Sequence, residues 1–185
     1  MWVLDDRLIL SATDLSDFVS CQHLTQLKHA SVLGADIERH QSEMSRLLQQ
    51  LGAEHERKHL ERLVHGRTTV EFSEEVARNA KTYADLEVAA LATRDAMESG
   101  VDVIYQPSFL DGNWYGRADF LIRIEPPPGA AYSYEVYDTK LATTARAEAL
   151  LQLCEYSRQV ALVQSHAAAN MHVVLGDDST LSYPY

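Results

Sequence analysis

Two aspartates and a lysine in the middle of the sequence have the types and spacing needed for metal-assisted hydrolysis. Asp138 and Lys140 are two residues apart in YSYEVYDTK, and side chains at that spacing share a face of a strand. Asp119 lies in the preceding predicted strand. If the two strands pair, two carboxylates and one ammonium converge. Mg²⁺ prefers such carboxylates with water and phosphate oxygens, and a nearby lysine can polarise the attacking water or neutralise charge on a phosphate.

A long helix over residues 38–65 is predicted to bring a histidine to this region. Its periodicity places four apolar residues in one stripe that should face the core, Met44, Leu47, Leu48 and Leu51. His55 continues that stripe and is therefore expected to point inward. Glu56 is about 100° around the helix from His55 and could orient ligands from outside the first coordination shell.

The remaining pattern predicts alternating helices and strands. Ser11 and Asp14 form a capping box for a first helix. A second helix is expected over 73–99, with Ser73 as N-cap and Gly100 as its stop. The central sheet should begin with one strand over 101–109 and continue, after an Asp111-Gly112 turn, into the strand that carries Asp119.

The end of the sequence completes the expected sheet. Thr143 or Thr144 should cap a helix that runs to about Ser165, and MHVVLG at 171–176 should form a last strand. Because a crossover helix precedes it, this strand is expected to lie parallel to an inner strand. We expect an α/β fold with a mixed central sheet of about four or five strands flanked by helices.

An acidic residue on one strand followed by D-x-K on the next resembles the PD-(D/E)XK nuclease superfamily. The order of the motifs is most similar to its RecB-like branch, which includes RecB and AddB nuclease domains and CRISPR-associated RecB-like exonucleases. The residues that carry this resemblance run in the family's order from 55 to 156: His55, Asp119, Asp138-Thr139-Lys140, Gln152 and Tyr156.

The resemblance implies a restriction-endonuclease-like fold and a metal-dependent deoxyribonuclease of DNA repair or processing. It implies that Mg²⁺ or Mn²⁺ is held by three side chains and one backbone carbonyl, those of His55, Asp119, Asp138 and Thr139. Lys140 would then position the attacking water. Gln152 would steady Lys140 or the substrate backbone, and Tyr156 would contact a phosphate or base. DNA, single-stranded or as a duplex end, is the implied partner, and a helicase domain or subunit is another.

Some RecB-like nucleases also hold an iron–sulfur cluster through four cysteines. The sequence contains only Cys21 and Cys154, and two thiols do not complete such a cluster. Cys21 is therefore expected to be a small buried residue. At 185 residues the chain is expected to be a single RecB-like domain. We interpret it as the N-terminal part of a longer protein.

Two alternatives use the same residues differently. His55-Glu56-Arg57-Lys58-His59 matches H-E-x-x-H, the pattern of a zinc metalloprotease, with Glu74 or Glu75 as arbitrary choices of a third ligand. The charged Arg57 and Lys58 are unusual there. The other alternative is a non-catalytic module that binds DNA ends or acts as a scaffold beside a helicase.

The composition is that of an ordinary globular protein, with 46% hydrophobic and 23% charged residues. It contains no apolar run long enough to cross a membrane and no secretory pattern, so a cytoplasmic location is expected. A net charge of −11 disfavours binding to phosphate backbones. The acidity is uneven, however: residues 71–102 hold eight acids against three bases, whereas 103–169 hold seven against five. The acidic surface can therefore face away from a substrate.

Overall fold

A mixed six-stranded sheet forms the centre of the molecule, in the order β10-β9-β8-β7-β4-β3. The computed structural model describes residues 1–38, 42–73 and 79–185. Pairs β3–β4 and β8–β9 are parallel and the other three pairs are antiparallel. The expected α/β class with helices around a mixed sheet is confirmed. Strands β8 and β9 are parallel, as predicted from the helix that connects them.

The strands are short, and two additional hairpins lie outside the central sheet. The sheet strands are β3 (Thr69–Glu71), β4 (Val103–Tyr105), β7 (Phe120–Ile124), β8 (Ser133–Thr139), β9 (Asn170–Val174) and β10 (Thr180–Pro184). The hairpins are formed by β1 (Trp2–Leu4) with β2 (Arg7–Ile9), and by β5 (Ser108–Asp111) with β6 (Trp114–Arg117).

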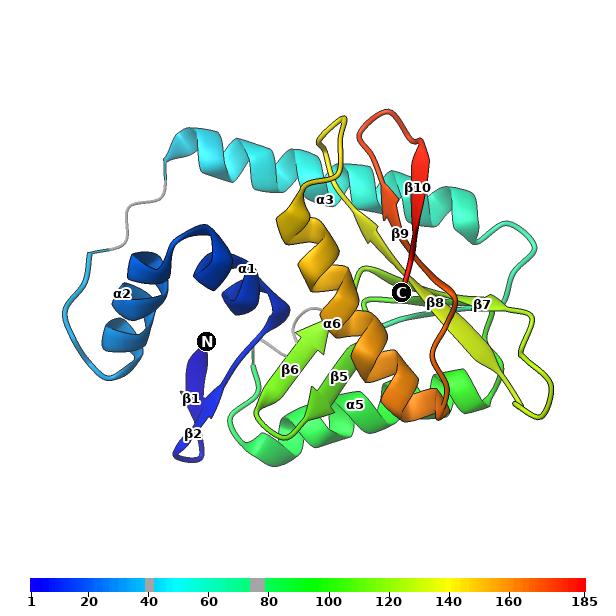
Figure 1. Ribbon diagram of the computed structural model, residues 1–185, viewed down its shortest axis with the longest axis horizontal. Coiled ribbons are helices and arrows are strands. Elements are labelled where there is room, and N and C mark those ends of the chain that lie inside the picture. Colours follow the sequence, from blue (N-terminus) through cyan, green and yellow to red (C-terminus); the bar gives the residue numbers. More distant parts are fainter. Residues whose placement is uncertain (39–41, 74–78) are drawn as a thin grey trace.

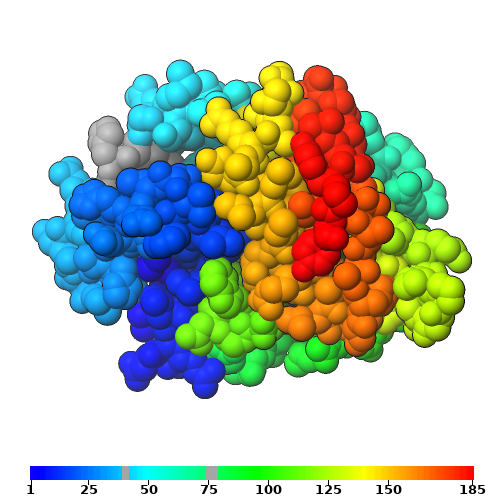
Figure 2. All heavy atoms as spheres, viewed as in Figure 1, coloured from blue at the N-terminus to red at the C-terminus, as the bar shows by residue number. Residues whose placement is uncertain are grey.

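Of the five helices with described bounds, three pack on the central sheet and the first two lie to one side of it (Figure 1). The five helices are α1 (Ala12–Ser20), α2 (Gln22–Val32), α3 (Glu43–Leu63), α5 (Tyr83–Glu98) and α6 (Ala147–Gln164). The predicted capping box of Ser11 and Asp14 begins α1. Figure 2 shows α1 lying against the N-terminal half of α6, where the Ser16 hydroxyl donates a hydrogen bond of 3.0 Å to the Glu148 carbonyl.

The two faces of the sheet are covered by different helices. Alternate residues of β7 and β8, including Leu121 and Val136, pack in the main core together with Leu153 of α6. On the opposite face Phe120 packs with Leu60 of α3. Helices α3 and α6 therefore pack on opposite faces of the sheet.

The apolar stripe predicted for the long helix is exposed, which corrects one expectation. Four residues in the N-terminal half of α3, Met44, Leu47, Leu48 and Leu51, are between 42% and 63% exposed. The reason is visible in Figure 1, where this half of α3 extends beyond the sheet. His55, in the half that reaches the sheet, is buried as expected.

Several predicted element boundaries are wrong, including the start of the helix expected over 38–65, which begins at Glu43. The helix expected over 73–99 is described as α5, which begins at Tyr83 with Thr82 as N-cap, because Thr82 and Asp85 form a capping box; residues 74–78 lie outside the described residues. The single strand expected over 101–109 is divided into β4 and β5 at Gln106, whose φ of 57° ends the extended conformation. The helix expected after Thr143 or Thr144 has Arg146 as its N-cap.

Candidate active site

The register of β7 and β8 brings the two aspartates predicted as metal ligands together. Phe120 pairs with Tyr137 across these antiparallel strands. Asp119, one residue before β7, therefore lies opposite Asp138, and directly opposed residues project from the same face of a sheet. The convergence of the two aspartates that was expected from the sequence is present. Asp119, however, was expected within a strand that follows the Asp111-Gly112 turn, and it lies in the turn between β6, which contains Tyr115, and β7.

Asp138 is a carboxylate in an unfavourable environment. It is only 3% exposed, and burial together with the negative charge of Asp119 raises its pKa to about 7. One oxygen, Oδ2, forms an ion pair with the Lys140 ammonium but accepts no well-oriented hydrogen bond from the described residues. Burial opposes the charge of Lys140, yet the negative charges of Asp138 and Asp119 outweigh it and raise the lysine pKa.

Asp119 is held in place by the strand that carries the other acid. Its Oδ2 accepts hydrogen bonds from the Thr139 backbone N–H at 2.6 Å and from the Thr139 hydroxyl at 2.8 Å. These bonds fix the direction of the Asp119 carboxylate next to Asp138. Thr139 therefore positions an acidic side chain. The predicted role of its backbone carbonyl as a metal ligand stays a prediction.

Helix α6 contributes the two residues predicted to contact substrate. Gln152 and Lys140 line the same pocket of about 410 Å³, together with Ser20, Thr144 and Arg146. Tyr156, one turn further along, is buried. Its pKa is raised by burial and by the charges of Asp138 and Asp119. Gln152 thus shares a pocket with the lysine, whereas Tyr156 is buried and close enough to the two acids for their charges to affect it.

Helix α3 adds Glu56 through a partner that the sequence did not suggest. The Gln106 amide nitrogen donates a hydrogen bond to Glu56 Oε1, and the negative charge of Glu56 contributes to the raised pKa of Asp138. Glu56 was predicted to orient ligands, and it lies near enough to the acids to affect them. Burial and the charge of Glu56 also raise the pKa of Tyr105.

Gln106 was missed by the sequence analysis. It is 4% exposed, and as a non-glycine residue at φ 57° it occupies a conformation that costs free energy. Its backbone N–H donates a hydrogen bond of 2.8 Å to the Asp119 carbonyl, so it connects the residue before β7 to Glu56 on α3. The one available signal was the Gln-Pro dipeptide that interrupts an otherwise strand-like run.

His55 is not brought into a metal cluster with the two aspartates. Its Nδ1 lies 3.8 Å from Asp178 Oδ1, and its buried Nε2 has no hydrogen-bond partner among the described residues. Within the described ranges no group of three or more His, Cys, Asp or Glu side chains is arranged to hold a metal ion. The assignment of His55 as a ligand stays a prediction.

The H-E-x-x-H alternative gains no third ligand from the described residues. His59 packs edge-on against the Phe120 ring, with 5.2 Å between the ring centroids, and burial lowers its pKa to about 4. Asp178 is close to His55, but it forms an ion pair with Arg62. Glu74 and Glu75, considered as third ligands, lie outside the described residues.

The cysteines differ from expectation in one respect. Cys21 was expected to be buried and is exposed. It lies between α1 and α2, where it serves as C-cap of the first helix and N-cap of the second, so the chain turns outward there. Cys154 is half-buried on α6, with its sulfur 3.8 Å from the sulfur of Met171.

A scan of the chain against protein-family models found no match, and a search of curated proteins likewise found none. The relation to RecB-like nucleases therefore rests on the sequence motifs alone. Among the described residues, none of the helices has the length and apolar character needed to span a membrane.

The acidic pair at the end of β8 fits a divalent cation. Two adjacent carboxylates, one of them fully buried and with a raised pKa, repel each other when both are ionised. A cation between them would remove that cost, and Mg²⁺ needs only one or two carboxylates because water and substrate oxygens complete its shell. The neighbouring Lys140 ammonium is then a positive group that can act on water or phosphate.

Proposed function

We propose that this protein is a divalent-metal-dependent nuclease that hydrolyses phosphodiester bonds, with DNA as its substrate. The observation that carries the proposal is the buried Asp138 carboxylate between Asp119 and Lys140. Perturbed acids beside a lysine are typical of sites that perform chemistry, because a purely structural site gains nothing from the cost of burying such charges.

In the proposed reaction Asp119 and Asp138 would hold the cation, which would supply Lewis-acid chemistry by lowering the pKa of a water and neutralising charge on the phosphate. Thr139 keeps the Asp119 carboxylate oriented through its two hydrogen bonds. Lys140, one-third exposed, holds the attacking water or the phosphate oxygen with its ammonium. Because its pKa is raised, it stays protonated at neutral pH and acts through its charge rather than as a base.

The pocket beside Lys140 supports a phosphate-bearing substrate. Its polar lining includes a second cation, Arg146, and hydroxyls from Ser20 and Thr144. Arg and Lys next to hydroxyl groups are the side chains that contact nucleic-acid phosphates and sugars. Although the whole chain carries a charge of −11, Glu148 is the one acidic residue among the described residues that line this pocket.

The test is cleavage of labelled single-stranded and duplex DNA with Mn²⁺, measured for the wild type and for Lys140→Ala. The loss of one electrostatic partner of the transition state should lower the rate by about 10²–10³. Lys58→Ala is the matched control, because Lys58 is exposed and forms an ion pair with Glu54 in its own helix. Cleavage that survives unchanged in Lys140→Ala would refute the assigned role.

A non-catalytic scaffold is distinguished by metal binding. Calorimetric titration of the wild type with Mn²⁺ should give heat that Asp119→Ala abolishes. A protein that shows neither Mn²⁺ binding nor cleavage would instead be a binding module. Retention of stoichiometric Zn²⁺ through purification, lost in His59→Ala, would identify the metalloprotease.

A further inference from the structure

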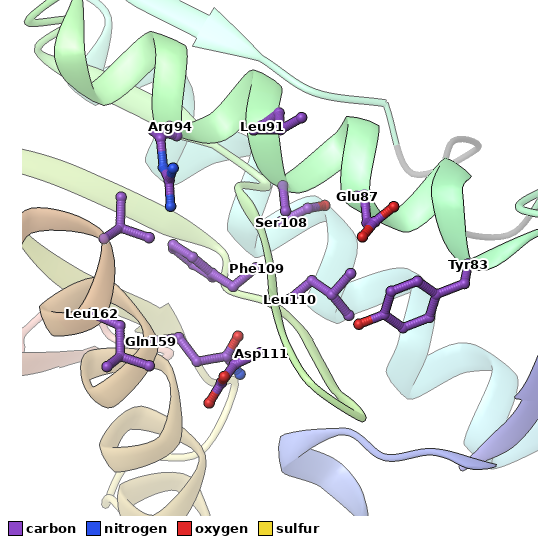
Figure 3. Close-up of a pocket in the computed structure, with 12 residues that line it drawn as sticks. Tyr83, Glu87, Leu91, Arg94, Ser108, Phe109, Leu110, Asp111, Gln159 and Leu162 are labelled. Atoms are coloured by element: carbon purple, nitrogen blue, oxygen red, sulfur yellow. The ribbon is translucent and has the colours of Figure 1, made fainter. Parts of the chain in front are cut away.

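A second pocket lies away from Lys140, between α5, β5 and α6 (Figure 3). Its volume is about 600 Å³. Most of its wall is apolar, formed by residues of all three elements: Ala90, Leu91, Phe109, Leu110, Leu162 and Val163. Leu91 and Leu162 are more than half exposed, so apolar surface continues from the cavity onto its rim. The proposed nuclease chemistry uses none of these residues.

The pocket runs along the edge of β5 that does not pair with β6. All four residues of this strand line it, from Ser108 to Asp111. Since alternate side chains of a strand point to opposite faces, a cavity that contacts four consecutive residues follows the backbone edge. The other edge of β5 is occupied by β6, its strand partner.

The hydrogen-bond pattern identifies the backbone groups that face this edge. Leu110 pairs with Tyr115, and the Tyr115 N–H donates outward to the Leu10 carbonyl at 2.9 Å. The pair is therefore of the non-hydrogen-bonded kind, in which both residues turn their N–H and C=O groups away from each other. Ser108, two residues earlier, donates its outward N–H to the Thr93 hydroxyl at 2.8 Å. The N–H and C=O of Leu110 have no such partner in the described part of the chain.

Two polar side chains add recognition chemistry to the apolar wall. Gln159 is 2% exposed, and its amide nitrogen donates to Glu155 at 2.9 Å, which fixes the orientation of the amide. Its Oε1 has no hydrogen-bond partner in the described ranges, and a buried unpaired acceptor is costly. Arg94 extends from α5 toward the cavity (Figure 3), so a negative group is favoured at that end.

From this geometry we infer that the pocket binds an extended peptide segment of a partner protein, which adds a strand to the free edge of β5. The segment exchanges backbone hydrogen bonds with Leu110, places one large apolar side chain between Leu91 and Leu162, and carries an acidic group opposite Arg94. Unpaired strand edges are ready templates for such addition, and pockets for alternate side chains then give the specificity.

The test is selection of octapeptides from a random phage-displayed library on the immobilised protein. The enriched peptides should share a large apolar residue with an acidic residue near it. An enriched peptide, synthesised with a fluorescent label, should bind the wild type in an anisotropy titration. Ala90→Trp, which fills the cavity from α5, should weaken binding by about tenfold or more. Ala53→Trp, on the exposed surface of α3, is the matched control and should bind normally.

Backbone pairing is tested on the wild type alone, so a poorly folded variant does not decide the outcome. Two versions of the peptide carry N-methyl groups at alternate residues, in opposite phases. One phase should lose about tenfold in affinity, the equivalent of one or two net backbone hydrogen bonds, while the other phase binds normally. Failure to enrich any motif, binding that survives Ala90→Trp, or equal binding of both phases would each overturn the proposal. So would occupation of the pocket only by a small apolar dye such as anilinonaphthalene sulfonate.

Discussion

Replacement of Asp138 by asparagine should change how the stability of the protein depends on pH. Asparagine has nearly the same shape as aspartate but carries no charge. In the wild type the folded state raises the pKa of this carboxyl from 3.8 to about 7, because burial and the Asp119 charge penalise ionisation. Asp138→Asn removes that titration and leaves the packing of the site almost unchanged.

The sign and size of the effect follow from proton linkage. Between pH 4 and 7 the folded state binds a proton at Asp138 that the unfolded state has already released. The contribution of Asp138 to the free energy of unfolding of the wild type therefore falls as pH rises through this window and is flat above it. A shift of about three pKa units corresponds to at most about 4 kcal/mol. Asp138→Asn should gain up to this amount relative to the wild type between pH 4 and pH 8.

Urea denaturation, followed by circular dichroism at several pH values in the presence of EDTA, measures the difference directly. The difference between the two unfolding free energies should grow between pH 4 and 7 and then level off. The control is Asp95→Asn, at an exposed position of α5, whose curve should run parallel to that of the wild type. A constant difference between wild type and Asp138→Asn across the whole range would refute the reasoning, because it would mean that folding does not perturb this carboxyl.

Two further predictions concern the surroundings of the site. Gly116→Ala should destabilise the fold by about 1–3 kcal/mol, since a Cβ there would lie 2.9 Å from the Tyr156 ring. The control, Gly52→Ala in an open part of α3, should stabilise the fold by about 0.5–1 kcal/mol. Urea denaturation midpoints of the two variants that shift in the same direction would contradict this. The ring protons of His59, whose pKa burial lowers to about 4, should show no NMR titration between pH 5.5 and 8, and a midpoint near 6.5 would contradict the burial argument.

The pairing of acids and lysine could be predicted because it depends on the period-two geometry of strands. That geometry requires Asp138 and Lys140 to share a face, and one antiparallel register brings Asp119 opposite. The helix pattern was less informative about burial. The periodicity of α3 showed which residues share a stripe, but not that Leu47 and its neighbours extend beyond the sheet. How far a helix runs past its sheet is a property of the assembled fold.

Gln106 shows what sequence patterns could not provide. The sequence over 101–109 predicts one strand, because apolar residues lie on both sides of Gln106 and Pro107, yet the left-handed conformation of Gln106 divides it into β4 and β5. That break redirects the chain so that β5 leaves the central sheet and pairs with β6, while the Gln106 amide reaches Glu56. Local propensity disfavours such a conformation, and tertiary contacts with Asp119 and Glu56 stabilise it.

The electrostatics of the site are the reason for proposing a catalytic protein rather than a scaffold of the same fold. Keeping Asp138 buried beside Asp119 costs free energy whenever both are ionised, and the Lys140 ion pair offsets only part of that cost. A scaffold could replace Asp138 with an apolar or amide side chain and become more stable. A divalent cation reverses this balance, because it gives the two carboxylates a common partner and becomes the larger charge in the site. The same buried charge that makes the metal-free fold less stable above pH 7 is therefore what would make the site select a cation.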